Sequence, residues 1–179
     1  MKSNSRMFHW MKGAALVAAL TMAGLTAANA ASLTQVASRD GGFTVNMPAR
    51  ASDEVTTLDN GVQLHQFTTT EGDAVYLVSY STLGYDVTGV SSDDTFDTAV
   101  AGALEPINGH ATSTQDFSSQ GFPARQVKGY GAKDGINFVM TYRVYRVGNR
   151  LYQVMLLSPS NEAWPSDATD FFNSFRFTN

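Results

Sequence analysis

The sequence predicts an α+β domain in which helices cover a central antiparallel β-sheet, an α/β/α sandwich. Three observations support this fold class. Alternating apolar segments are separated by tight-turn dipeptides, among them Asn60-Gly61, Asp134-Gly135 and Gly148-Asn149. Helical periodicity occurs in only two places, too few for helices to serve as crossovers between parallel strands. No internal repeat or linker divides residues 31–179, which indicates one domain.

Residues 1–30 have the three parts of a secretory signal peptide. Basic residues without acids precede an apolar run of sixteen residues, 13–28, and Ala28-Asn29-Ala30 supplies the small-x-small pattern of a signal peptidase site. The run is shorter than the ~20 apolar residues that span a bilayer, and no cysteine follows it for lipid attachment. We therefore expect cleavage after Ala30 and an exported protein, periplasmic or secreted, with no stable membrane anchor.

Charge and cysteine content exclude several classes of function. Removal of residues 1–30 takes away three of the twelve Lys and Arg residues and none of the sixteen Asp and Glu residues, which leaves a net charge of −7. Such a chain is poorly suited to bind nucleic acid or anionic lipid, since both attract positive charge. The absence of cysteine excludes disulfides, thiolate metal sites and thiol catalysis. The 149 remaining residues are enough to bury a core.

The first part of the mature chain is predicted to form strands. Residues 31–40 are small and polar and are predicted to be a loose lead-in. Phe43, Val45 and Met47 then share one face of a strand that Pro48 ends. Asn60-Gly61 joins two strands in a hairpin. These and the next predicted strand cover residues 54–59, 62–70 and 74–82.

A helix is predicted next, from Asp93 to Glu105. Its apolar residues recur with helical spacing, acids at its start favour the positive end of the helix, and Pro106 stops it. A second helix is predicted after Pro159. Ser160 or Asn161 would cap this second helix, and its inward-facing residues would be Trp164, Ala168, Phe171 and Phe172.

Four strands are predicted between these helices, and the last three form a meander. Two of them, 136–147 and 151–158, carry apolar residues on both faces, which indicates central strands covered on both sides. A short strand with Phe175 and Phe177 closes the chain. The other two strands of this group cover residues 107–117 and 122–132.

Three passages resemble the PsbP-like superfamily, which includes photosystem II extrinsic proteins and many bacterial exported proteins. They are Gly42-Phe43-Thr44-Val45-Asn46-Met47-Pro48, Gly121-Phe122-Pro123-Ala124-Arg125, and Arg150-Leu151-Tyr152-Gln153-Val154 with Phe171-Phe172-Asn173-Ser174-Phe175-Arg176-Phe177. The likeness runs over most of residues 40–178. It implies the sandwich fold and a mostly accessory or binding role, and it supplies no catalytic residues to carry over.

No group of residues points to catalysis, to a metal or to a cofactor. His65 and His110 are the histidines left after residue 30, and their spacing is not that of metal ligands. A hydrolase built around either histidine is the weakest of the functional hypotheses. Asp93, Asp94 and Asp97 are interpreted as acids at a helix start, because they lack the glycine and distal glutamate of a calcium loop.

The basic residues are unevenly distributed. Residues 121–150 hold six of them against one acid, Asp134, whereas residues 40–116 hold twelve acids and one base, Arg50. Arg143 and Arg146 differ in parity and are predicted to point to opposite faces. This asymmetry suggests a docking surface for another envelope or secreted protein. The residues chosen for that surface are Arg125, Lys128, Tyr130 and Arg146.

The sequence therefore predicts a non-enzymatic exported accessory protein that binds another protein. The alternative is a carrier of a small molecule or lipid, held in an aromatic-lined cleft between a helix and the sheet. The aromatic residues available for such a cleft are Phe67, Tyr76, Tyr80, Tyr142, Tyr145, Tyr152 and Trp164.

Overall fold

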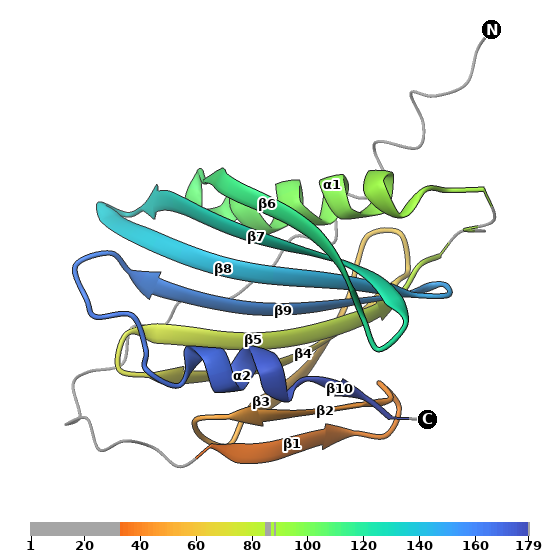
Figure 1. The fold of residues 1–179 in the computed structure, drawn as a ribbon, viewed down its shortest axis with the longest axis horizontal. Coiled ribbons are helices and arrows are strands. Elements are labelled where there is room, and N and C mark those ends of the chain that lie inside the picture. The colour runs from red at the N-terminus through yellow and green to blue at the C-terminus, as the bar shows by residue number, and fades with distance from the viewer. Residues whose placement is uncertain (1–32, 85–86, 88, 179) are drawn as a thin grey trace, which may run out of the picture.

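A computed structural model describes residues 33–84, 87 and 89–178 (Figure 1). The predicted signal peptide, residues 1–30, lies outside the described residues. The strands are β1 (Thr34–Ser38), β2 (Phe43–Met47), β3 (Ser52–Thr57), β4 (Gln63–Glu71), β5 (Ala74–Thr82), β6 (His110–Ser119), β7 (Phe122–Lys133), β8 (Ile136–Val147), β9 (Arg150–Pro159) and β10 (Arg176–Phe177). The helices are α1 (Ser92–Leu104), the short 3-10 helix η2 (Glu105–Ile107) and α2 (Ala168–Ser174). Neither α-helix of the described chain is long and apolar enough to cross a membrane.

Seven strands form one antiparallel sheet in the order β3-β4-β5-β9-β8-β7-β6. The predicted hairpin at Asn60-Gly61 joins β3 to β4, and the predicted meander is β7-β8-β9. The two predicted groups of strands meet where β5 pairs with β9, with Tyr80 opposite Tyr152. Because β9 lies in the middle of the sheet, its apolar residues are buried on both faces, as the sequence predicts.

A second sheet of three strands, β1-β2-β10, packs against the first. The prediction of a loose lead-in over residues 31–40 is wrong at residues 34–38, because β1 pairs with β2 over its whole length, Val36 opposite Val45. β1 is an edge strand with mostly exposed side chains. It therefore lacks the apolar alternation that marks a strand in a sequence, and its position depends on hydrogen bonds to β2.

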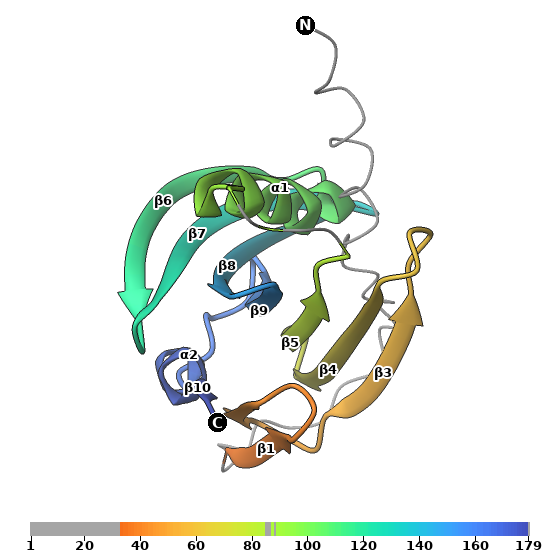
Figure 2. The same cartoon turned by 90° about the vertical axis from the view of Figure 1, so that its right-hand side faces the viewer.

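The two faces of the large sheet are covered differently (Figure 2). α1 lies on one face, over β7 and β8, and its Phe96 and Leu104 join a buried cluster with Leu77 and Met155. α2 and the small sheet lie on the other face. The structure is mostly β, with only two α-helices in the described residues, so the prediction that helices cover the sheet is overstated.

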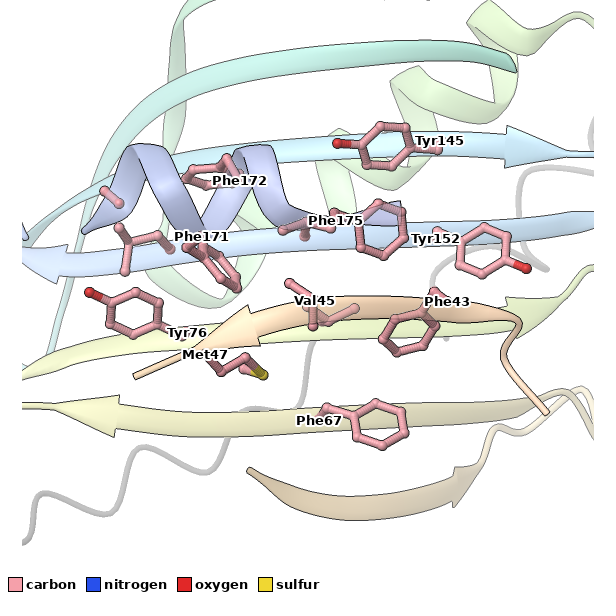
Figure 3. Close-up of a cluster of buried hydrophobic side chains, with 14 of the residues drawn as sticks. Phe43, Val45, Met47, Phe67, Tyr76, Tyr145, Tyr152, Phe171, Phe172 and Phe175 are labelled. Carbon is pink, nitrogen blue, oxygen red and sulfur yellow. The ribbon is translucent and has the colours of Figure 1, made fainter. Parts of the chain in front are cut away.

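Aromatic rings fill the space between the large sheet and the small one (Figure 3). Phe43 of β2 is fully buried, with ring centroids 5.4 Å from Phe67 and 5.5 Å from Phe175. Tyr76 of β5 lies 5.1 Å from Phe171 of α2. These contacts join the first strands of the chain to its last residues, so the small sheet and α2 are held by burial of rings.

The helix boundaries confirm one prediction and correct another. α1 begins after Ser91, whose side-chain oxygen accepts a hydrogen bond from the backbone of Asp94 at 3.1 Å, as expected for a helix cap. The second helix begins at Ala168, eight residues after the predicted cap Ser160. Pro165 lies in this interval, and the residue before a proline is biased away from helical backbone. Trp164 is consequently 40% exposed instead of facing inward.

The glycines of β7 permit the close approach of η2 and of the first residue of β6. A Cβ on Gly131 would collide with the carbonyl oxygen of Ile107, and one on Gly129 would lie 2.9 Å from the carbonyl oxygen of His110. Both glycines lie inside a regular strand, so they serve backbone packing.

Candidate binding cleft

Arg125, the first residue of the predicted docking surface, is buried beneath α1. Its Nε donates to Asp116 Oδ1 at 2.6 Å, and its Nη2 donates to Asp116 Oδ2 at 3.0 Å. Nη1 donates to Asp97, and Nη2 also reaches Asp93 Oδ1 at 3.3 Å. The guanidinium lies 5.6 Å from the centre of the Phe96 ring. Arg125 therefore ties α1 to β6 and β7.

This ion cluster changes the acid–base properties of its members. The hydrogen bond from Arg125 lowers the pKa of Asp116 below its ordinary value, and the same bond raises the pKa of Arg125. Asp93 and Asp97, predicted as acids at a helix start, are positioned by α1 to face this arginine. Among the described residues, no three acidic or histidine side chains gather in a way that could hold a metal ion.

Arg146 also lies on the face of the sheet that α1 covers. Its Nη1 donates to the carbonyl oxygen of Val90 at 2.7 Å, and its Nη2 donates to that of Val87 at 3.2 Å. The predicted opposition of Arg143 and Arg146 is confirmed, because Arg143 packs on Phe172 of α2, on the other face. Arg146 thus fastens the segment that leads into α1.

The remaining two residues of the predicted surface lie on the opposite face. Lys128 and Tyr130 of β7 are exposed, Tyr130 to 53%, and they differ in parity from Arg125. The four residues therefore do not form one surface. The correction follows from strand geometry, since neighbouring side chains in β7 alternate between the two faces.

A cleft of about 530 Å³ opens on the face that carries Lys128. Strands β6, β7 and β8 form its floor, and α2 with the preceding turn forms its wall. The residues that line it are Thr112, Gln126, Lys128, Gly129, Val139, Met140, Thr141, Arg143, Trp164, Ala168, Thr169, Phe172 and Asn173. Among these lining residues two side chains are basic, Lys128 and Arg143, and none is acidic.

Arg143 is held in place within the cleft. Its Nε donates to Gln126 Oε1 at 2.7 Å, and its Nη1 donates to the carbonyl oxygen of Phe172 at 3.1 Å. The guanidinium lies 5.1 Å from the centre of the Phe172 ring and 5.7 Å from that of Phe117. Nη1 also lies 3.5 Å from Asn173 Oδ1. Arg143 is therefore a cation that its neighbours hold in place beside the cleft.

Of the seven aromatic residues proposed for a carrier cleft, one lies at this cleft. Trp164 lines the cleft, whereas the other six aromatic residues proposed for it are buried in the two cores. Tyr142 illustrates the difference. Its hydroxyl donates to Gln153 Oε1 at 2.8 Å inside the sheet, and burial raises its pKa. The aromatic residues thus mainly build the fold.

The two histidines lie far apart in the sheet. His65 stacks on Tyr80 with ring centroids 4.4 Å apart, at a second cleft formed with Asp40 and Arg150. His110 begins β6, with its ring 6.0 Å from that of Tyr130. Each histidine has an aromatic neighbour, and neither contacts the other.

No family model matches the sequence, and no curated protein matches it. Solved structures do. The solution structure of cyanobacterial PsbP from Synechocystis sp. PCC 6803 aligns with a TM-score of 0.59 at 13% identity, covering 87% of this chain and 98% of that one. The chain has a PsbP-like fold. The resemblance inferred from the three sequence passages is thereby confirmed at the level of the fold, which is all that an identity this low can show.

Two further solved structures align less closely. One is a protein of unknown function and putative regulator from Pseudomonas aeruginosa, at 10% identity and a TM-score of 0.45, covering 72% of this chain and 83% of that one. The other is the Saccharomyces cerevisiae Ran-binding protein Mog1p, at 12% identity and a TM-score of 0.49, covering 83% and 97%.

Proposed function

We propose that this is an exported, non-enzymatic accessory protein that binds an acidic segment of another envelope or secreted protein in the cleft beside α2. The observation that carries the proposal is the composition of the cleft. Its lining includes Lys128, Arg143 and Trp164 and no acidic residue, in a chain whose net charge is negative. A local cationic site on an acidic protein selects partners by charge complementarity.

The three side chains have distinct roles in this proposal. Arg143 is fixed by Gln126 and by the Phe172 ring, so little conformational entropy is lost when it receives a carboxylate. Lys128 is exposed and can adjust to the partner. Trp164 supplies an apolar surface, and arginine and tryptophan are enriched among residues that dominate binding energy.

The predicted export and the fold both support this assignment. A signal peptide over residues 1–30 would place the mature chain among envelope or secreted proteins. The superfamily that the sequence resembles consists mostly of accessory or binding proteins. Neither observation specifies the partner, so the chemistry of the cleft defines it as an acidic protein segment.

A second candidate function is a carrier of a small acidic molecule. The volume of about 530 Å³ favours it, because small-molecule sites commonly occupy roughly 300–1,000 Å³. Native mass spectrometry of the protein purified from its own host separates the two functions. A bound small mass supports the carrier, and a bound polypeptide supports the accessory protein.

The proposed protein partner is tested by affinity capture from the host envelope with matched charge variants. Lys128→Glu reverses a charge inside the cleft, while Lys133→Glu makes the same change at the end of β7, outside the lining residues. We expect the Lys128→Glu variant to capture at least about tenfold less partner than the wild type. The Lys133→Glu variant should capture as much as the wild type. Equal capture by both variants would exclude the cleft as the docking site.

A further inference from the structure

β6 is a free edge of the large sheet. Its ten residues, His110–Ser119, pair with β7 on one side, and no described strand pairs with the other side. Figure 2 shows β6 as the last ribbon of the sheet. Most of its residues are exposed. The outward N–H and C=O groups of such a strand can form a ladder with another chain.

The usual protections of an edge strand are sparse on β6. Proteins protect edges with lysine, proline or bulges. β6 contains neither lysine nor proline, and its one irregularity lies between Ala111 and Ser113. The stretch from Ser113 to Ser119 pairs regularly with β7, so it offers about seven residues of continuous backbone.

The opposite edge of the sheet, β3, differs in charge and length. It has six residues, and it carries Asp53 and Glu54 next to each other. Like charges would repel an acidic segment there. On β6 the single acid is Asp116, which is neutralised by Arg125. Of the two edges, β6 is therefore the one compatible with the acidic partner proposed above.

Register places one face of β6 beside the cleft. Ser113 lies opposite Lys128, and Gln115 lies opposite Gln126, so both share the face that carries the cleft. Thr114 and Asp116 point to the other face, toward α1. A strand added to β6 would place every second side chain on the face of Lys128, roughly 10 Å from β7. A glutamate and a lysine side chain together span that distance.

We infer that the acidic segment binds as an added β-strand along β6, with carboxylates at alternate positions directed to Lys128. This inference rests on the proposed function and specifies the conformation of the partner. Backbone hydrogen bonds to β6 supply the register, and the cleft selects the acidic side chains. The segment recognised is thus extended and has an acid at every second residue.

The test uses three ten-residue peptides and the chain 31–179. One peptide alternates Thr and Glu, the second has the same sequence with every backbone nitrogen methylated, and the third has its five glutamates contiguous. Trp164 is the single tryptophan of residues 31–179, so its fluorescence reports on the cleft. Hydrogen exchange of residues 110–119 reports on the edge.

We expect the alternating peptide to shift the Trp164 fluorescence and to slow exchange in residues 110–119. The N-methylated and contiguous peptides should bind at least about tenfold more weakly, because the first cannot donate ladder hydrogen bonds and the second cannot align its acids. Gln115→Glu should weaken binding of the alternating peptide severalfold. Thr114→Glu, the same charge on the opposite face, should weaken it less.

The contrary outcomes are distinguishable. Equal binding of all three peptides, abolished by Lys128→Glu, would overturn strand addition and leave the acidic cleft intact. Binding of none would overturn both proposals. Concentration-dependent protection of residues 110–119 without peptide would show that a second copy of this chain occupies the edge, which also overturns the inference.

Discussion

The two faces of the β7–β8 pair use basic residues for different purposes. On the α1 face, Arg125 is buried and surrounded by three aspartates. On the α2 face, Lys128 and Arg143 line an open cleft without an acid. The two groups come from the same short stretch of sequence. Strand register thus divides a run of basic residues into cations that hold the fold and cations that remain available for a partner.

The two faces also differ in the interactions that hold α1 and α2 on the large sheet. The α1 face combines an apolar helix stripe with the Arg125 ion cluster. The α2 face depends on rings, and on the Tyr76 hydroxyl, which donates to Asp167 Oδ1 at 2.6 Å. Burial and this hydrogen bond raise the pKa of Tyr76, so the tyrosine stays neutral and serves as a donor.

Removal of a central ring should have the largest effect on stability. Phe43→Ala deletes a fully buried side chain that contacts rings of the large sheet and the ring of Phe175, and we expect a loss of about 4 kcal/mol in the free energy of unfolding. Chemical denaturation monitored by circular dichroism measures it. Val55→Ala is the control, because Val55 is 53% exposed and should change stability little. A loss below about 1 kcal/mol for Phe43→Ala would contradict the proposed role of the rings.

The Arg125 cluster should have a smaller, pH-dependent effect. Arg125→Met keeps much of the packing and removes the charge, and we expect a loss of about 1.5 kcal/mol at pH 7, a modest value because the aspartates are largely exposed. Since the folded-state pKa of Asp116 is lowered, its contribution is present at neutral pH and is lost as the pH falls below about 4.

Denaturation of the wild type and Arg125→Met at pH 7 and at pH 3 checks this account. The difference between the two proteins should shrink at pH 3, where Asp116 becomes increasingly protonated. A difference that is equal at both pH values would show that Arg125 contributes through packing alone.

Lys128 should have the smallest effect on folding. It is exposed and lies in no ion pair of the described residues, so Lys128→Glu should change the free energy of unfolding by less than about 0.5 kcal/mol. The same denaturation experiment measures it at pH 7. A larger loss would place Lys128 with Arg125 among the residues that hold the fold and would remove the contrast between the faces.

Local sequence patterns predicted most of the strands. The limits of β5 and β8 coincide with the prediction, because turn residues bound both strands and apolar residues fill them. β1 was missed since its side chains are exposed and its hydrogen-bonding partner lies elsewhere in the chain. The late start of α2 was missed because Trp164 is spaced from Ala168 like an apolar residue of the same helix, across Pro165.

The candidate site was predicted only in part. Lys128 and Trp164 were singled out from the sequence, and both line the cleft. The burial of Arg125 could not be predicted from the sequence. Its three aspartate partners come from α1 and β6, and no spacing rule shows that these two segments lie together. The importance of Arg143 could have been found from register, since Gln126 lies opposite it in the β7–β8 hairpin.

Site-specific photo-crosslinking in the native host tests the central claim most directly. A photoreactive amino acid at Thr169, an exposed residue that lines the cleft, should crosslink to a partner protein, and the same amino acid at Val55 on the opposite edge should not. Lys128→Glu should abolish the crosslink from position 169. A partner captured equally from both positions, or from position 55 alone, would contradict the assignment of recognition to the α2 face.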